Sequence, residues 1–250
     1  MNSNPIFNKI AKQQETEMLK EQASYKGVMA KTATQFGVLL LAALGSLFLL
    51  GLSETVYVTL LVLSFIVGFI SVIIASSNFK RAKVFGYVYA ASEGFLMGFI
   101  SILFALAFPG FNVVGLAVLI TFGIFAGMLV LYLTKLIQVT SRFRRVMMGI
   151  SFGILFSMLF VGIISLFDRG QTWYLLFGDP LSPLVLIITL LFILYGSFML
   201  VVSFDDAKRI VESGASKDYE YMVGLGLVIS TVYIYLQVLR LLAIILSRRD

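Results

Sequence analysis

Seven long apolar segments follow one another along the chain, separated by short polar stretches. With a span-length window they cover 32–52, 55–76, 84–107, 112–134, 147–167, 184–203 and 222–246. Each is close to the roughly 20 apolar residues that an α-helix needs to cross a bilayer, and each is too continuously apolar for a strand of a membrane barrel. Because the lipid core offers no partners for free backbone amides, we predict helices. The pattern therefore predicts an all-α membrane protein with seven transmembrane helices.

The composition agrees with this class and excludes several functions. Of the 250 residues, 60% are hydrophobic and only 13% are charged, whereas soluble domains have about 25% charged residues. The chain contains no Cys and no His, which excludes disulfides, thiolate metal sites and catalysis by a Ser-His pair. It also has no zinc-protease motif and no phosphate-binding glycine loop. We therefore expect no enzyme activity and no cofactor.

Basic residues gather on one side of the predicted membrane. The side that holds the N-terminus carries Lys9, Lys12, Lys20, Lys26, Lys31, Lys80, Arg81, Lys83, Lys135, Arg142, Arg144, Arg145, Lys208, Arg209 and Lys217. The other side carries Arg169, Arg248 and Arg249. The positive-inside rule then predicts a cytoplasmic N-terminus and an outer C-terminus, as in a bacterial inner membrane. The net charge of +6 thus indicates orientation in the bilayer rather than a nucleic-acid partner.

The chain before the first span is predicted to be a cytoplasmic tail of residues 1–31, followed by a transmembrane domain of residues 32–250. The tail is too long and too mixed in charge for a secretory signal, so we expect the first span to be retained. A short interfacial helix is one interpretation of the tail, and a solvated segment is the other. The apolar residues of such a helix are Ile6, Phe7, Ile10 and Ala11.

Two charged residues lie well inside the predicted spans, Glu93 in the third and Arg240 in the seventh. An isolated charge at the centre of a membrane helix costs roughly 2.5–3.5 kcal/mol or more. We therefore expect both side chains to face the bundle interior as an interhelical ion pair, either as a fixed clamp or as part of a gate. Their depths differ, about 15 Å for Glu93 and about 27 Å for Arg240 from the starts of their spans. Two alternatives stay open: no pairing, or a neutral Glu93 that carries a proton.

Two adjacent carboxylates, Asp205 and Asp206, follow the sixth span. Carboxylates where a helix leaves the bilayer are suited to contact a hard cation such as Ca²⁺, or to share a proton. Consecutive helical side chains point about 100° apart, so only one of the two is expected to face the bundle. The alternative interpretation is a charged helix end balanced by Lys208 and Arg209.

Short segments spread over nearly the whole chain carry a resemblance to a known family. They are SNPIF (3–7), YKGVMAKTA (25–33), YAASEGFLMGFIS (89–101), FPGFNVVGLAVLITFG (108–123), VTSRFRR (139–145), GASKDYEY (214–221) and YIYLQVLRLLAI (233–244). In this order and spacing the chain resembles the Bax inhibitor family of membrane proteins, especially its bacterial branch. The resemblance implies six helices wrapped around a central seventh, and an association with calcium leak and protection against stress. It also implies that Glu93 and Arg240 form an interhelical pair.

The resemblance further implies a pH-sensing pair of aspartates, one ending the sixth helix and one in the seventh. Counting back from the arginine of the seventh span places the first on Asp206, whereas alignment on the FD dipeptide favours Ser203 or Asp205. The second falls on Ser230, and the seventh span contains no acid. Two carboxylates therefore cannot share a proton across these helices. We expect the Ser230 hydroxyl at most to hydrogen-bond to Asp205 or Asp206.

These observations support two functions of different kinds. The first is a calcium-permeable leak, or its regulator, with Asp205 or Asp206 at the cytoplasmic mouth and Ser230 in the path. The second is a non-conducting protein that modulates a membrane-anchored AAA protease, with the lysine-rich tail as the handle. A proton-coupled transporter acting through Glu93 is a third hypothesis, for which the sequence shows no substrate pocket.

Overall fold

The computed structural model describes residues 22–48 and 53–248. Seven long helices cover most of these residues, and all seven are apolar and long enough to cross a membrane. They are α2 (Tyr25–Leu47), α3 (Glu54–Ser77), α4 (Phe79–Ala107), α5 (Val113–Leu133), α6 (Ser141–Phe167), α8 (Pro183–Glu212) and α9 (Tyr219–Ser247). A short helix α7 (Gln171–Trp173) and one π-helical turn η1 (Tyr174–Gly178) join α6 to α8. The predicted all-α fold with seven spans is therefore confirmed.

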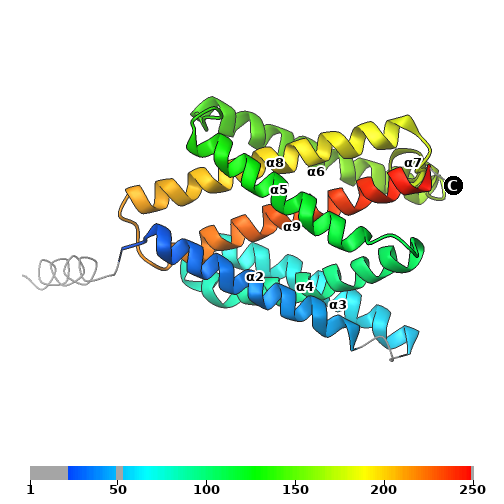
Figure 1. The fold of residues 1–250 in the computed structure, drawn as a ribbon, viewed down its shortest axis with the longest axis horizontal. Coiled ribbons are helices and arrows are strands. Elements are labelled where there is room, and N and C mark those ends of the chain that lie inside the picture. Colours follow the sequence, from blue (N-terminus) through cyan, green and yellow to red (C-terminus); the bar gives the residue numbers. More distant parts are fainter. Residues whose placement is uncertain (1–21, 49–52, 249–250) are drawn as a thin grey trace, which may run out of the picture.

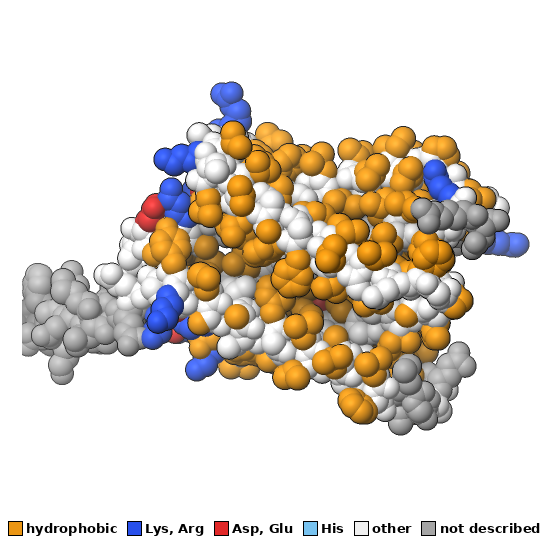
Figure 2. Space-filling model, in the orientation of Figure 1, with side chains coloured by type: hydrophobic (Ala, Val, Ile, Leu, Met, Phe, Trp, Pro, Cys, Tyr) orange, Lys and Arg blue, Asp and Glu red, His pale blue; other side chains and the backbone are white. Residues whose placement is uncertain are grey.

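The long helices alternate in direction, so the bundle has two distinct ends. At one end, which we call the basic end, α2, α4, α6 and α9 begin and α3, α5 and α8 finish. The other end, which we call the far end, holds α7 and the C-terminal end of α9 (Figure 1). Figure 2 shows most of the visible Lys and Arg side chains at the basic end and an apolar surface along the flank. This division matches the charge pattern of the sequence.

Polar caps define where several helices start. Ser24, Asn78, Asn112 and Thr140 each accept a hydrogen bond from a backbone N–H in the first turn of the helix that follows. Such caps satisfy amides that have no partner inside the helix. Helix α8 begins instead with Pro183, whose missing N–H is not needed at that position.

The helices extend past the predicted spans mainly at the basic end. Helix α6 begins at Ser141 rather than at 147, and α8 continues to Glu212 rather than ending at 203. At the far end the observed and predicted limits of α4, α6 and α9 agree to within one residue. Hydropathy detects only the segment in lipid, whereas backbone hydrogen bonds continue the helix into the polar layer. The predicted interfacial helix around Ile6 to Ala11 lies outside the described residues.

Helix α9 forms the centre of the bundle. It has the largest buried share of the seven spans and packs against α2, α4, α5 and α8. Its side chains Val228, Ile234, Val238 and Leu239 are fully buried. Helix α3 packs mainly on α4, and α6 contacts α7 and α8 while exposing most of its apolar side chains. The predicted central seventh helix is thus observed, with α3 and α6 in outer positions.

Candidate functional site

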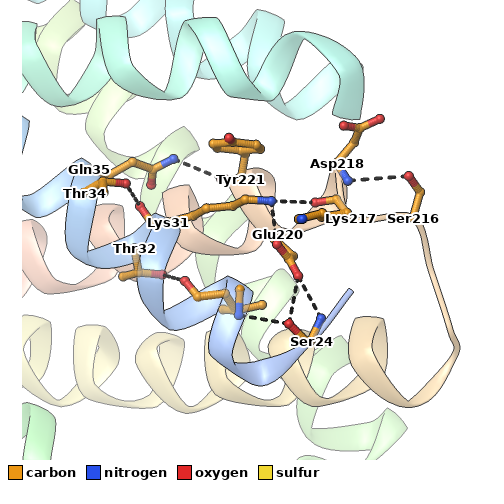
Figure 3. A network of polar contacts seen from close by, with 12 residues as sticks. Ser24, Lys31, Thr32, Thr34, Gln35, Ser216, Lys217, Asp218, Glu220 and Tyr221 are labelled. Carbon is orange, nitrogen blue, oxygen red and sulfur yellow. Dashed lines mark hydrogen bonds and ion pairs between the residues drawn. The ribbon is translucent and has the colours of Figure 1, made fainter. Parts of the chain in front are cut away.

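The first of two charged clusters at the basic end surrounds Glu220. Its carboxylate is fully buried and lies 2.5 Å from the Lys31 ammonium, which also donates to the backbone carbonyl of Lys217 at 3.1 Å. The other carboxylate oxygen accepts from the backbone N–H of Ser24 at 2.8 Å and from its hydroxyl at 3.3 Å. Figure 3 shows how these groups converge. We call Ser24, Lys31 and Glu220 the Glu220 cluster; it joins the start of α2 to the start of α9.

Backbone contacts strengthen this junction. The N–H of Ala23 donates to the carbonyl of Ala215 at 2.8 Å, and Gln22 forms an isolated antiparallel bridge with Ser216. Gly27 faces Glu220 so closely that a Cβ atom at this position would overlap the carboxylate. Glycine is needed here for a close approach between two chain segments.

A buried amide extends the junction toward the membrane. Gln35 is fully buried and donates to the backbone carbonyl of Tyr221 at 3.1 Å (Figure 3). The Lys31 ammonium lies 4.2 Å from the centre of the Tyr221 ring, a cation–π contact. Gly224 of α9 lies against Thr32 and Gln35, which allows the helices to pack closely. Helices α2 and α9 are therefore fixed to each other over several turns.

The second cluster contains the two predicted aspartates. The Arg144 guanidinium donates to Asp205 at 2.8 Å and to Asp206 at 2.6 Å. Asp205 also accepts from Arg209 at 2.6 Å and from the Tyr132 hydroxyl at 3.4 Å. We call these five residues the Arg144 cluster; it joins the start of α6 and the end of α5 to α8. Asp205 is the aspartate that faces the bundle, since its side chain is 13% exposed against 45% for Asp206.

Ser230 has a different partner from the one expected. Its hydroxyl lies 3.1 Å from that of Ser203, and Ser203 also donates to the carbonyl of Met199 at 3.1 Å. The expectation of a bond from Ser230 to Asp205 or Asp206 was wrong, because both aspartates lie beyond Ser203 on α8 and face Arg144. The contact between α8 and α9 at this level is therefore a pair of neutral hydroxyl groups.

The structure does not bring Glu93 and Arg240 together. A hydrogen bond of 2.7 Å between Ser101 and Tyr235 sets α4 and α9 in register. Glu93 lies about 12 Å before this level and Arg240 about 7 Å beyond it, at 1.5 Å per residue. Helix tilt and the arginine stem cannot close a gap of about 20 Å. The predicted pair is corrected accordingly.

Each of these two charged residues has other surroundings. Arg240 donates to the backbone carbonyl of Phe177 at 2.8 Å, and its guanidinium lies 5.2 Å from the centre of the Phe177 ring. The Glu93 side chain is half-buried and points toward Gly68 of α3. Within the described residues it forms no ion pair. Glu93 and Arg240 therefore belong to separate regions of the bundle.

At the far end, arginine side chains donate hydrogen bonds to backbone carbonyl groups. Arg248 donates to the carbonyls of Pro180, Leu181 and Ser182 at 3.0–3.3 Å. Arg240 donates to the carbonyl of Phe177 in the same connecting segment. Asp168, at the end of α6, accepts from the Thr172 hydroxyl and from backbone N–H groups. These bonds lower the pKa of Asp168, with the Thr172 hydroxyl the largest cause.

A cavity of about 1060 Å³ opens beside the Arg144 cluster. Its walls come from α2, α5, α8 and α9, and they include Phe36, Phe125, Phe204 and Leu227. Asp205 lines it at the basic end, together with Tyr132. In residues 22–48 and 53–248, no group of three or more acidic side chains is arranged to hold a metal ion. The cavity therefore offers Asp205 as a single carboxylate.

Sequence reasoning missed the Glu220 cluster and the role of Arg144. Glu220 lies in a polar loop segment that resembles a solvent-exposed turn, and Arg144 is one of three arginines in VTSRFRR. A signal was present, because YKGVMAKTA and GASKDYEY were both singled out as shared segments. The structure brings these two segments into contact through Lys31 and Glu220.

Comparison with known proteins identifies the family. A family model described as Bax inhibitor 1 like matches residues 4–247. The chain therefore belongs to the Bax inhibitor 1-like family. No curated protein and no solved structure matches the chain.

Proposed function

We propose that this member of the Bax inhibitor 1-like family serves ion homeostasis as a calcium-permeable leak, closed at its basic end by the Arg144 cluster. The observation that supports this most directly is the position of Asp205. Its carboxylate lines the cavity between the helices and is held at the same time by Arg144 and Arg209. A carboxylate in such a place is a suitable first contact for a hard cation once its arginine partners release it.

The described structure corresponds to a closed form under this proposal. Both oxygens of Asp205 already accept hydrogen bonds, so a cation has to displace a protein donor. Beyond the cavity, the buried part of α9 is apolar at Ile234, Val238 and Leu239. Opening then requires α8 to move relative to α9. Arg144 opposes that movement, because it ties the end of α8 to the start of α6.

Control by pH through a carboxylate pair between α8 and α9 is not part of the proposal. Ser203 and Ser230 occupy that contact, and hydroxyl groups do not titrate near neutral pH. The Arg144 cluster takes over as the point of control.

We further propose a non-enzymatic protein of a bacterial inner membrane, with the basic end in the cytoplasm and the C-terminus outside. The excess of Lys and Arg at the basic end supports this orientation.

The test is calcium entry into liposomes that contain the purified protein and a calcium dye. Replacing Arg144 by Ala removes one of the two arginines that hold Asp205 and cuts its tie to α6, and we expect the flux to rise several-fold over wild type. Arg145→Ala is the matched control, because among the described residues Arg145 forms no ion pair and donates to the backbone carbonyl of Ser141 in its own helix. Asp205→Asn should lower the flux of the Arg144→Ala variant. A folded, inserted Arg144→Ala protein with no flux above empty liposomes would refute the leak.

A second function, modulation of a membrane-anchored AAA protease, is favoured by a separate observation. The chain enters the bundle at Gln22 and Ala23, which are tied to Ser216 and Ala215 at the basic end. The lysine-containing residues 1–21 precede this point in the sequence, and the proposed orientation puts Gln22 on the cytoplasmic side, where such a protease works. We expect deletion of residues 1–20 to abolish binding to a purified protease of this class while leaving the fold intact. Equal binding by the full and the shortened chain would reject this function.

A further inference from the structure

The cavity described above is a groove that opens laterally toward lipid. Helices α2 and α5 both lie on the near face of the bundle in Figure 1, and they form its two sides. Met29 and Phe122 line it and are 72% and 67% exposed, so its mouth faces the bilayer rather than the bundle interior. Its floor is formed by Phe204 of α8 and Leu227 of α9. The groove is therefore an apolar slot that is open to the lipid phase.

The groove spans one leaflet. On α5 its lining extends from Leu133 to Phe122, about 17 Å along the helix, and on α2 from Tyr25 to Phe36, also about 17 Å. The hydrocarbon core of a bilayer is about 30 Å thick, so a slot of this length matches one acyl chain of a single leaflet. All of this lining belongs to the half of the bundle next to the basic end.

The rim of the groove at the basic end is positively charged. Lys135 and Lys208 both line it, together with Gln138. Lys135 forms no ion pair within the described residues, and Lys208 has only a long, exposed contact of 3.8 Å with Glu212. The one acid in the lining, Asp205, is neutralised by two arginines. Two ammonium groups are thus available to an anion at the level of the lipid headgroups.

We propose that this groove binds an anionic phospholipid. One acyl chain lies between α2 and α5 against Phe204 and Leu227, and the phosphate lies on Lys135 and Lys208. Basic pockets between membrane helices on the cytoplasmic side are suited to anionic headgroups. The lipid would contact Phe204 and Tyr132, and Tyr132 belongs to the Arg144 cluster through its bond to Asp205. This inference is independent of the leak, because it requires no conduction.

The chain allows a direct test by fluorescence quenching, because Trp173 is its only tryptophan. In a Trp173→Phe background, Phe125→Trp places the reporter in the groove. Phe152→Trp of α6 is the control, because it is 60% exposed and lies outside the groove. It lies about 17 Å from the basic-end start of α6, against about 12 Å for Phe125 from the basic-end finish of α5. Both proteins are placed in phosphatidylcholine nanodiscs with a minor fraction of brominated phosphatidylglycerol or of brominated phosphatidylcholine. Phe36→Trp, on the opposite wall, replaces Phe125→Trp if that variant does not fold.

We expect the groove reporter to be quenched several-fold more by the brominated anionic lipid than the control, and equally by the brominated neutral lipid. Two lysines correspond to a preference of about tenfold or more for the anionic headgroup. Lys135→Ala with Lys208→Ala should remove the preference, whereas Lys80→Ala with Arg81→Ala, which removes equal charge from the same end, should leave it. Equal quenching at both positions would overturn the site, and so would a preference that survives loss of both lysines. Quenching of the control alone would show that the groove holds no lipid.

Discussion

The Glu220 cluster and the Arg144 cluster lie at the same end of the bundle but differ in their environment. In the Glu220 cluster the carboxylate is fully buried and its lysine partner is only 13% exposed. In the Arg144 cluster, Asp205 is 13% and Arg144 is 23% exposed, but their further partners Asp206 and Arg209 are 45% and 54% exposed. The first joins α2 to α9, at opposite ends of the sequence, whereas the second joins neighbouring helices through their solvent-facing ends.

This difference in exposure predicts a difference in the free energy needed to break each cluster. Removing one partner of a buried pair leaves a charge without solvent, which makes the pair costly to break. A partly exposed pair exchanges its partner for water and contributes much less. We therefore expect the Glu220 cluster to stabilise the bundle, and under the proposed function we expect the Arg144 cluster to be the contact that opens.

The largest effect is expected from Glu220→Gln. The change leaves the Lys31 ammonium without its counter-ion and should lower the free energy of unfolding by about 3–5 kcal/mol. The measurement is unfolding in detergent micelles by added SDS, followed by circular dichroism. Glu212→Gln is the control, since this exposed acid contacts Lys208 at 3.8 Å and should cost at most about 0.5 kcal/mol. Similar losses for the two variants would remove the distinction between the clusters.

A glycine exchange tests the same junction without changing any charge. Gly27→Ala places a methyl group against the Glu220 carboxylate and should cost about 1–3 kcal/mol through displacement of the buried acid. Gly37→Ala in the same helix meets no atom within 4 Å, and it should stabilise α2 by up to about 1 kcal/mol. The same unfolding assay compares them. A gain in stability for Gly27→Ala would mean that the Glu220 carboxylate can move aside without lowering the free energy of unfolding.

Substitutions in the Arg144 cluster should change the stability of the protein less, and the calcium flux more, than substitutions in the Glu220 cluster. Arg144→Ala should lower the free energy of unfolding by only about 1 kcal/mol, because Asp206 is 45% exposed and Asp205 keeps its ion pair with Arg209. Arg145→Ala should have no measurable effect on stability. Unfolding of both variants is measured beside the calcium flux described above. A loss for Arg144→Ala as large as that for Glu220→Gln would assign both clusters to structure.

Much of the fold could be predicted because hydropathy reports burial in lipid directly. Hydropathy misses the start of α6 and the end of α8 because these turns at the basic end are helical but polar. The clusters could not be predicted in the same way. The sequence gives no means of distinguishing Arg144 from Arg142 or Arg145, since the choice depends on which helix face meets α8. Glu220 is buried only because α2 begins next to it.

The smallest effect is expected where the sequence pointed most strongly to an ion pair. In a double-mutant cycle of Glu93→Gln and Arg240→Met, the coupling energy should lie below about 0.5 kcal/mol, as for residues that share no partner. Arg240→Met alone should cost about 1 kcal/mol, through loss of its bond to the Phe177 carbonyl. A coupling energy of about 2 kcal/mol or more is typical of residues in contact. Such a value would show that the two residues meet in another state of the bundle. Since the described structure separates them along the membrane normal, that state would require α4 and α9 to slide past each other, and it would relocate the gate from the Arg144 cluster to the centre of the membrane.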